Sequence, residues 1–490
     1  MNDDAPHQRS DLYRIATRAM TERGLEPEFS SHVFEQLSLI TGPGHETSPD
    51  IQDLTGWLWC SIDNDDSLDL DQLTVCEPLE GGAVKLLVAI ADVDTLVKKG
   101  SPIDDHARLN TTSVYTSARI FPMLPERIST DLTSLNAGEN RLALVTEMIF
   151  NADGVLASSS VCRARVRSYG KLAYDSVAAW LDGQGNLPAA AVAVPGLAAQ
   201  LQMQDALAQR LRARRQSQGA LEFQSFQPHA VFEGEKVVAI RQQVQNRARQ
   251  LIEEFMLAAN GCNARFLTAH GGPSLRRVVR SPERWLRIVE VAKRYGEALP
   301  AEPDAQALAS FLASRRTADP LRFADLSLVI VKLMGSGEYV VQEAGAPAIG
   351  HFGLTARDYV HSTAPNRRFP DLVTSRLLKA ALAGSTSPYS NAELTALALH
   401  CTQQENAAQK VEREMRKSEV ALLLQARIGE DFDGIVTGST QQAAWVRTFS
   451  PPAEGKLVAG ANGLQVGDKV RLRLLSTDVE RGFIDFARVE

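Results

Sequence analysis

The chain has 490 residues, of which 44% are hydrophobic and 23% charged, as is ordinary for a soluble globular protein. No apolar run approaches the ~18 residues that a transmembrane helix requires, and the acidic, polar start does not look like a signal peptide. The net charge of −7 argues against a general nucleic-acid binder, so any contact with nucleic acid needs local basic patches. Five scattered cysteines without a CxxC pair favour reduced thiols over disulfides or zinc. We therefore expect a cytoplasmic protein without a membrane segment, whose metal, if it has one, is held by oxygen atoms.

The first 48 residues read as helical. Leu12, Ile15 and Met20 recur at helical spacing before Gly24 ends the pattern, and a second helix is predicted to start near residues 28–31. No alternating strand pattern precedes residue 50. We predict a small α-helical module, which is either part of a helix-turn-helix or an extension packed on the next domain.

Five aspartates within nine residues mark the segment that follows, at positions 63, 65, 66, 69 and 71. Carboxylates this close repel one another unless a positive charge lies among them. Tryptophans before the run and leucines 68, 70 and 73 after it suggest that the segment folds against a core, where a hard cation such as Mg²⁺ is the usual partner. A solvated acidic loop is the alternative. An EF-hand is excluded, because Leu68 stands where that loop needs glycine and Thr74 where it needs glutamate.

The middle of the chain, residues 49–427, mixes strands and helices. Strands are predicted at Leu86–Ala91 and Leu142–Ile149. Helices are predicted at Gln204–Arg215, Ala248–Arg265, Pro282–Glu297, Leu326–Met334 and Asp371–Ala383. Two stretches rich in alanine and proline, Pro188–Pro195 and Pro300–Ala309, look like surface connectors. Basic residues cluster at 163–171, 210–215 and 276–280, and the second cluster is most simply a solvated helix face.

The tail, residues 428–490, changes to the period of strands. Five short strands separated by Gly, Pro and Asn turns are predicted, at Phe432–Val436, Ala444–Arg447, Gly455–Val458, Lys469–Leu475 and Gly482–Phe486. Strands of this number and length suit an all-β OB-fold barrel.

The spacing of the acidic residues is more specific than their number. Asp63, Asp69, Asp71 and Gln72 stand at offsets of zero, six, eight and nine, which resembles the signature of the ribonuclease II / ribonuclease R family of RNB-domain exoribonucleases. Further matching segments follow in the family's order: Val88–Val93, Phe121–Pro125 with the Ser129–Leu135 region, Gly350–Leu354 and Ala364–Asp371. The resemblance covers residues from about 50 to about 425. The helical N-terminus departs from the family, whose members usually begin with cold-shock OB folds.

The resemblance implies a multidomain α+β protein: a helical N-terminal module (1–48), a central mixed α/β RNB-like catalytic domain (49–427) and a C-terminal OB-fold RNA-binding barrel (428–490). The implied activity is Mg²⁺-dependent, hydrolytic 3′→5′ exoribonuclease action on single-stranded RNA, processive and releasing nucleoside 5′-monophosphates. We expect a monomer.

The resemblance also assigns roles to residues. Mg²⁺ would be held by Asp63, Asp69, Asp71 and Gln72, and Asp71 corresponds to the aspartate whose loss is most damaging. Arg367 corresponds to an arginine that faces the scissile phosphate, where a guanidinium suits an oxyanion gaining charge. The alternative for Arg367 is a structural salt bridge with Asp371.

Four further residues are implied to contact RNA. Tyr115 and Phe223 match rings that clamp the terminal nucleotides, since stacking tolerates any base. Glu253 matches an acidic residue that contacts the RNA, and Glu412 matches a position near the substrate. Three of them have a simpler alternative: core burial for the two rings, Phe223 above all because it lies in a strand-like stretch, and a solvated partner on a charged helix for Glu412.

Two departures from the family bear on activity. Gln72 replaces the fourth aspartate, so the site should bind Mg²⁺ more weakly or recruit Asp65 or Asp66. Asn366 and Ser375 replace the usual isoleucine and histidine of the arginine block. The main alternative function is therefore a catalytically weakened RNB-fold protein that binds RNA and regulates. A metal phosphodiesterase for small nucleotides is a third reading, which the RNA-binding type of tail argues against.

Overall fold

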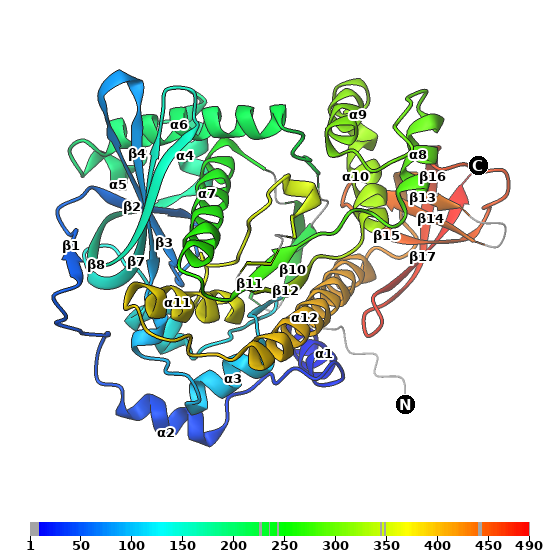
Figure 1. The fold of residues 1–490 in the computed structure, drawn as a ribbon. Coiled ribbons are helices and arrows are strands. Elements are labelled where there is room, and N and C mark those ends of the chain that lie inside the picture. The colour runs from blue at the N-terminus through cyan, green and yellow to red at the C-terminus, as the bar shows by residue number, and fades with distance from the viewer. Residues whose placement is uncertain are drawn as a thin grey trace.

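The computed structural model describes residues 9–224, 228–234, 236–242, 245–343, 345–346, 349–439 and 443–489. Figure 1 shows a strongly bent sheet at one end, a barrel at the other, and the long helix α12 crossing between them. The predicted fold class is confirmed: a mixed α/β centre, a small β-barrel at the C-terminus and helices at the N-terminus. Within the described residues, no helix is both long and apolar enough to cross a membrane.

The central sheet has the order β1-β8-β2-β3-β4-β7, and β8 also pairs with β7, so the sheet closes on itself. The long β8 makes this possible, because residues 156–167 pair with β7 and residues 168–173 with β2. The predicted strands at 86–91 and 142–149 are confirmed as parts of β4 and β7. The strands are β1 (Ile51–Asp53), β2 (Trp59–Asp63), β3 (Gln72–Pro78), β4 (Val84–Ala91), β7 (Asn140–Phe150) and β8 (Leu156–Ala173).

Both faces of this sheet are covered by helices. The run Val84–Ala91 is buried along almost its whole length, which explains why its sequence is continuously apolar rather than alternating. One face packs on α6 and α7, and the other on α3, α11 and the first part of α12. Bounds of the elements between β4 and β7 and on the two faces are α3 (Pro102–Asn110), β5 (Val114–Tyr115), β6 (Ile120–Phe121), α4 (Tyr174–Leu181), α5 (Ala189–Val192), α6 (Leu197–Ser217), α7 (Arg247–Ala269), α11 (Phe369–Leu382) and α12 (Asn391–Gln425).

A helical lobe, α8–α10, forms its own small core around Trp285, Phe311 and Phe323. The connector prediction was wrong in part: α5 lies inside 188–195, and α9 begins at Ala305, where the Asp304 side chain caps it. Alanine-rich sequence after a capping residue favours helix over loop. The remaining elements are β9 (Pro228–Glu233), β10 (Lys236–Gln242), β11 (Ser274–Val278), α8 (Trp285–Arg294), α9 (Ala305–Ala318), α10 (Pro320–Met334) and β12 (Glu338–Gln342).

The C-terminal barrel closes in the order β13-β14-β15-β17-β16, and all five predicted strands are confirmed. Apolar residues of the barrel share one core with α12 and with α1, from which Leu12, Ile15 and Met20 are fully buried. The two N-terminal helices pack on different elements, α1 on α12 and α2 beside α3. The domain boundaries at 48 and 427 remain a proposal. Bounds are α1 (Arg9–Thr21), α2 (Ser31–Leu39), β13 (Asp431–Ser439), β14 (Ala444–Thr448), β15 (Glu454–Ala459), β16 (Lys469–Asp478) and β17 (Phe483–Val489).

Candidate active site

The acidic run forms the turn between two adjacent strands of the sheet. Asp63 is the last residue of β2 and Gln72 the first of β3, and both are buried. Asp65 and Asp66 lie at the exposed part of the turn. Our expectation for Leu68 was wrong, because its side chain is 61% exposed, whereas Leu70 is buried as expected. The turn is therefore anchored from its second half, and only part of the run faces the interior.

Asp71 is the most buried carboxylate of the run, with no exposed surface. Its Oδ1 accepts a hydrogen bond from the backbone N–H of Asn366 (2.9 Å), and its Oδ2 accepts one from Nε of Arg367 (3.1 Å). Burial raises the pKa of Asp71 to about 7, although the nearby guanidinium of Arg367 opposes the shift. A buried carboxylate whose pKa is raised in this way is a candidate functional group.

Arg367 and Arg368 divide the two roles considered for the arginine block. Arg368, not Arg367, pairs with Asp371, at 2.8 and 2.9 Å. The alternative of an Arg367–Asp371 bridge is therefore wrong: Arg367 lies in a turn and Arg368 is extended at the start of α11, so their side chains reach different carboxylates. Arg367 pairs with Asp71 instead, and its side chain remains 40% exposed, which leaves donors available to a ligand.

Tyr115 and Glu412 lie at the same site as Asp69. The Tyr115 hydroxyl donates to Oδ2 of Asp69 (3.3 Å), and its backbone N–H donates to Oε1 of Glu412 on α12 (3.1 Å). The Tyr115 ring keeps 38% of its surface exposed, which suits stacking better than core packing. Burial raises the pKa of Asp69 and of Glu412, so both carboxyls lie partly out of water.

The donors present suit a hard cation. Oδ1 of Asp63 accepts from the backbone N–H of Asn64 (2.7 Å) and from Oγ of Ser67 (2.9 Å), and Oδ2 lies 3.5 Å from Nε2 of Gln72. Within the described ranges, no three Asp, Glu, His or Cys side chains converge as a ready ligand set. Mg²⁺ is usually bound through one or two carboxylates, with waters and substrate phosphates completing the octahedron. The pair of Asp63 and Asp69, with Asp71 beside them, fits that pattern.

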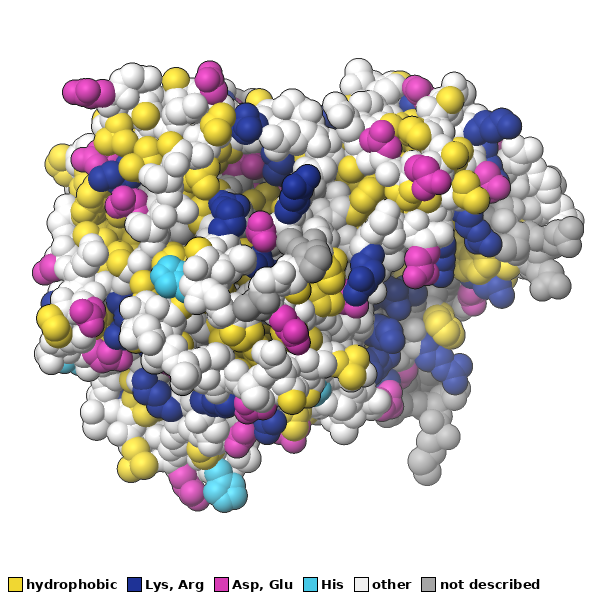
Figure 2. Space-filling view, viewed as in Figure 1, with side chains coloured by type: hydrophobic (Ala, Val, Ile, Leu, Met, Phe, Trp, Pro, Cys, Tyr) yellow, Lys and Arg dark blue, Asp and Glu magenta, His cyan; other side chains and the backbone are white. Residues whose placement is uncertain are grey.

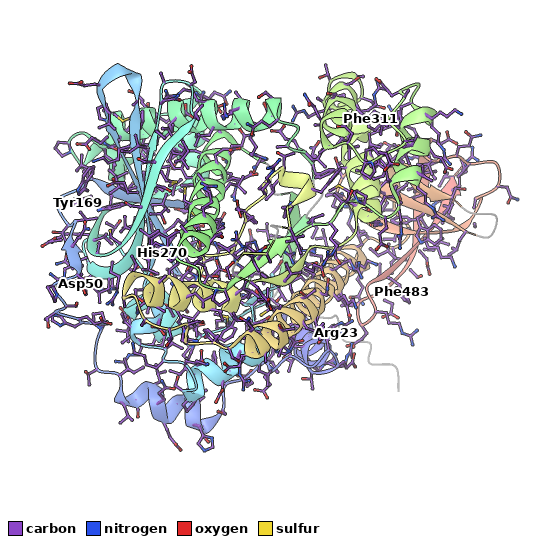
Figure 3. The ribbon with its side chains drawn as sticks, viewed as in Figure 1. Arg23, Asp50, Tyr169, His270, Phe311 and Phe483 are labelled. Carbon is purple, nitrogen blue, oxygen red and sulfur yellow. The ribbon has the colours of Figure 1, made fainter. Side chains whose placement is uncertain are left out.

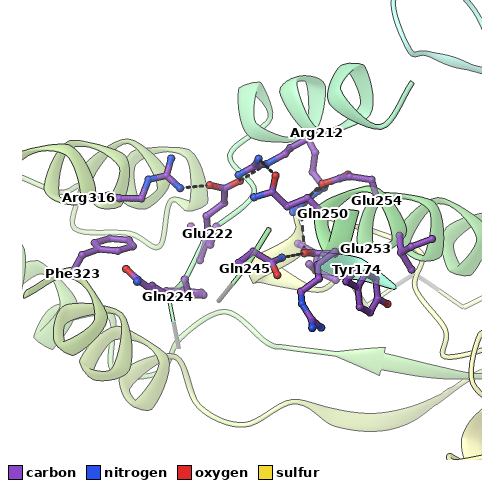
Figure 4. A pocket seen from close by; sticks show the side chains of 16 residues that line it. Tyr174, Arg212, Glu222, Gln224, Gln245, Gln250, Glu253, Glu254, Arg316 and Phe323 are labelled. Atoms are coloured by element: carbon purple, nitrogen blue, oxygen red, sulfur yellow. Dashed lines mark hydrogen bonds and ion pairs between the residues drawn. The ribbon is translucent and has the colours of Figure 1, made fainter. Parts of the chain in front are cut away.

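A cavity of about 800 Å³ opens between α6, α7 and the helical lobe (Figure 4). Glu253 of α7 and Phe223 both line it, as the family resemblance implies for residues that contact a strand. Phe223 belongs to no strand, but it is half-buried and packs against the core of the helical lobe, so both its stacking role and its alternative of core burial stay open. Oε2 of Glu253 accepts from Nε2 of Gln245 (2.9 Å), and burial raises the pKa of Glu253.

Arg212 and Arg215 of α6 line this cavity rather than a solvated helix face, whereas Arg214 is exposed as expected. Arg215 forms an ion pair with the buried Glu254 (2.5 Å), and Arg212 pairs with Glu222 (2.9 Å). Glu222 also pairs with Arg316 of α9, so one carboxylate joins both sides of the opening, as Figure 4 shows. Figure 2 shows basic and acidic side chains gathered around this central depression.

Two residues that the sequence analysis missed connect the cavity to the acidic turn. Arg249 donates to Oδ1 of Asn64 (2.8 Å), and its guanidinium lies 4.3 Å from the ring centre of Tyr174. Both line the cavity. Arg249 stands one helical turn before Glu253, so the same helix face carries both, and this spacing was the signal available in the sequence.

Comparison with known proteins decides the family. Residues 51–384 match the family model described as the RNB domain, which is more than half of the chain. The chain belongs to the RNB domain family. Residues 430–489 match the model described as the RNase II-type exonuclease C-terminal S1 domain, in agreement with the barrel. The resemblance to the ribonuclease II / ribonuclease R family is thereby confirmed.

Curated relatives carry the same domains in longer chains. Ribonuclease R of Escherichia coli (strain K12) is 30% identical over 466 residues, which cover 88% of this chain and 56% of the relative. Ribonuclease R 1 of Lactococcus lactis subsp. lactis (strain IL1403) is 28% identical over 457 residues, covering 87% and 55%. The chain thus spans about half the length of these relatives.

Solved structures show the same fold. Mycoplasma genitalium RNase R, in complex with ribose-methylated single-stranded RNA, superposes with a TM-score of 0.87 at 22% identity, covering 98% of this chain and 78% of that one. Yeast Ssd1, described as a pseudonuclease, superposes with a TM-score of 0.70 at 15% identity, covering 95% and 57%. At these identities the likeness concerns the fold alone.

Proposed function

We propose that the protein is a Mg²⁺-dependent, hydrolytic 3′→5′ exoribonuclease that degrades single-stranded RNA processively to nucleoside 5′-monophosphates. The observation that carries the proposal is the meeting of Asp69, Asp71 and Arg367 beside an open cavity, in a chain of the RNB domain family. The relatives named ribonuclease R and the RNA-bound structure from Mycoplasma genitalium support RNA as the substrate. We infer a monomeric protein acting in the cytoplasm.

The residues divide the work of phosphodiester hydrolysis. Bound Mg²⁺ would neutralise charge on the phosphate and make water more acidic, with Asp63, Asp69, Asp71 and Gln72 as its candidate holders. Asp71 orients Arg367, whose exposed guanidinium donors suit the oxygen that gains charge in the transition state.

RNA would be bound by Tyr115 beside the acidic turn and by side chains that line the cavity. The rings of Tyr115 and Phe223 offer faces for stacking, which tolerates every base. Glu253 keeps an acceptor near the opening, and a carboxylate that accepts from a 2′-hydroxyl helps to distinguish RNA from DNA. The barrel would add a second surface for the strand.

A regulatory RNA-binding protein is the second candidate, and Gln72 is the observation that favours it. The amide brings no charge to the metal, and its nitrogen lies toward Asp63. Yeast Ssd1, with the same fold, is described as a pseudonuclease, so the fold also exists without activity.

The decisive experiment is incubation with 5′-labelled single-stranded RNA, with Mg²⁺ and with a chelator. Progressive shortening from the 3′ end that requires Mg²⁺ is the expected result, with mononucleotides bearing a 5′-phosphate as product. Tight RNA binding with no shortening at any Mg²⁺ concentration would favour the regulatory protein. Single-stranded DNA of matched sequence is the control and should remain intact.

A further inference from the structure

A second charged site lies where α1, α12 and the turn between β16 and β17 meet. It is a cleft of about 590 Å³ lined entirely by charged side chains. Six of them are basic: Arg18, Arg23, Lys410, Arg413, Lys417 and Arg481. None of the residues implied to act in catalysis lines this cleft, and in Figure 3 Arg23 marks its position beside α12.

The acidic residues of the cleft are already paired by α1. Glu480 forms an ion pair with Arg18 (2.7 Å), and Glu414 forms one with Arg23. Glu22 lies 3.8 Å from Arg18 on the same helix. The arginines of α1 therefore neutralise the carboxylates and leave the basic residues of α12 uncompensated.

Those basic residues form a row along one face of α12. Lys410, Arg413 and Lys417 follow one another at three and four residues, all are exposed, and among the described residues no carboxylate reaches ion-pair distance of them. The helical rise spaces them about 4.5 and 6 Å apart along the axis. Val411 and Met415, on the opposite face, are fully buried, so packing fixes the direction in which the row points.

The barrel supplies the other wall through a close backbone approach. Gly482 has φ +64°, and a Cβ there would lie 2.6 Å from Cβ of Lys417. Only glycine allows this turn to lie directly on α12. The neighbouring Arg481 is thereby held beside the row; its backbone N–H donates to Oδ1 of Asp478 (3.0 Å), and its Nε lies 3.9 Å from Oδ2 of the same carboxylate. The cleft is thus built by three elements rather than by one solvated helix.

We propose that this cleft binds the phosphate backbone of the RNA strand at a site separate from the catalytic cavity. Three uncompensated cations in line, with Arg481 at one end, suit successive phosphates better than a single anion. In a protein of net charge −7 such a concentration of positive charge is local, and it would attract a polyanion while the rest of the surface repels it. α12 also carries Glu412 at the catalytic site, so one rigid element joins the two sites. The proposal rests on the proposed action on RNA.

A solvated helix face is the competing explanation, and salt dependence separates the two. The variant Lys410→Gln/Arg413→Gln/Lys417→Gln removes the row and keeps good helix formers. The matched control, Arg287→Gln/Lys293→Gln/Arg294→Gln on α8, removes three exposed basic residues that form no ion pair within the described part of the chain. Both are placed in an Asp71→Asn background, so that the RNA remains intact during binding.

Binding of long single-stranded RNA is measured from low to moderate salt. The row variant should lose about tenfold or more in affinity at low salt, and the slope of log K against log salt should fall by about 2, because about 0.7 is expected for each single-strand phosphate contact. The control variant should keep both. Equal affinity and slope in the two variants would overturn the proposal, as would a loss of affinity without a change in slope.

Failure of the proposed function would be seen separately. Cleavage by the wild type and by the row variant without Asp71→Asn is followed on a short oligomer at saturating concentration. The row variant should cleave it at the wild-type rate, because a short strand held in the cavity does not reach the cleft. Absence of cleavage by the wild type would refute the nuclease, while the binding comparison would still decide whether the cleft holds RNA.

Discussion

The acidic turn buries the carboxylate of a charged pair, whereas the barrel keeps its charged pairs at the surface. In the turn, Asp71 has no exposed surface and its partner Arg367 comes from almost 300 residues further along the chain. In the barrel, Asp431 and Asp433 of β13 pair with Arg473 and Arg471, which stand directly opposite on β16. These pairs are set by the register of two neighbouring strands.

The difference shows where charge has a structural role and where it has a chemical one. Exposed cross-strand pairs add little to stability and help to specify register. Buried carboxylates close to one another oppose folding unless they are paired, so a fold that keeps them gives up stability at that point. We interpret the buried group at Asp71 as a functional feature and the barrel pairs as structural ones.

The largest expected effect is at Asp71. Replacing it by Asn removes the carboxylate that orients Arg367 and is a candidate holder of Mg²⁺, so cleavage should fall by about 10³-fold or more. RNA affinity should change little, because the rings and the barrel are untouched. Single-turnover cleavage and equilibrium binding test both statements. An Asn variant that keeps most of its activity would refute the assignment.

Asp371 should come next, because it positions the arginine segment. Its Oδ1 accepts from the backbone N–H groups of Thr363 (2.7 Å) and Ala364 (2.9 Å), and Arg368 pairs with the same carboxylate. Asp371→Asn should lower the cleavage rate by about 10²-fold through misplacement of Arg367. It should also destabilise the fold by about 1–3 kcal/mol, since the half-buried Arg368 loses its charged partner and the buried side chain at 371 loses hydrogen bonds.

The rate and the stability of this variant distinguish positioning from folding. In an Arg367→Ala background, Asp371→Asn should cause no further loss of rate but the same loss in urea-unfolding free energy. Additive losses of rate would show that Asp371 acts by another route.

A smaller effect is expected on the barrel surface. Removing the barrel would expose the core it shares with α1 and α12, so a point substitution is the cleaner test. Trp445 on β14 is 44% exposed, and Trp445→Ala should weaken binding of long RNA by about tenfold, as expected for the loss of one stacked base. Val466→Ala, which trims an exposed apolar side chain, is the control. Unchanged affinity in the Trp445 variant would place RNA elsewhere on the barrel.

Gln72 should have a still smaller effect, visible in the metal requirement. Gln72→Asp restores a negative charge beside Asp63, so the variant should reach half-maximal rate at several-fold lower Mg²⁺ concentration than the wild type. Rate against Mg²⁺ concentration is measured for both. Coincident curves would show that residue 72 does not contribute to the metal site. An inert wild type with an active variant would favour the regulatory protein.

The smallest effect is expected at the barrel pairs. Asp433→Asn removes an exposed partner of Arg471 and should leave both thermal unfolding and RNA cleavage within error of the wild type. A clear loss of either would show that the surface pairs do more than specify the strand register. The distinction from the buried charges of the acidic turn would then be wrong.

The sequence predicted most of what local pattern controls. The five barrel strands were predicted because turn residues and alternation act over a few positions. The implied site residues also fall into place, with Tyr115, Glu412 and Asp69 in one set of hydrogen bonds. The error at Leu68 arose where burial depends on segments distant in the chain.

By itself, the sequence determined the family, the order of its parts and the residue types of a hard-cation, phosphate-directed site, because motif spacing and strand period are properties of short segments. Only the tertiary structure decided which arginine meets Asp71 and which meets Asp371, since Asp71 is brought to Arg367 from almost 300 residues away. Only the packing of α1 and the barrel against α12 made the basic row into a cleft. Such pairings depend on the free energy of burying distant surfaces against one another, which no local pattern in the chain records.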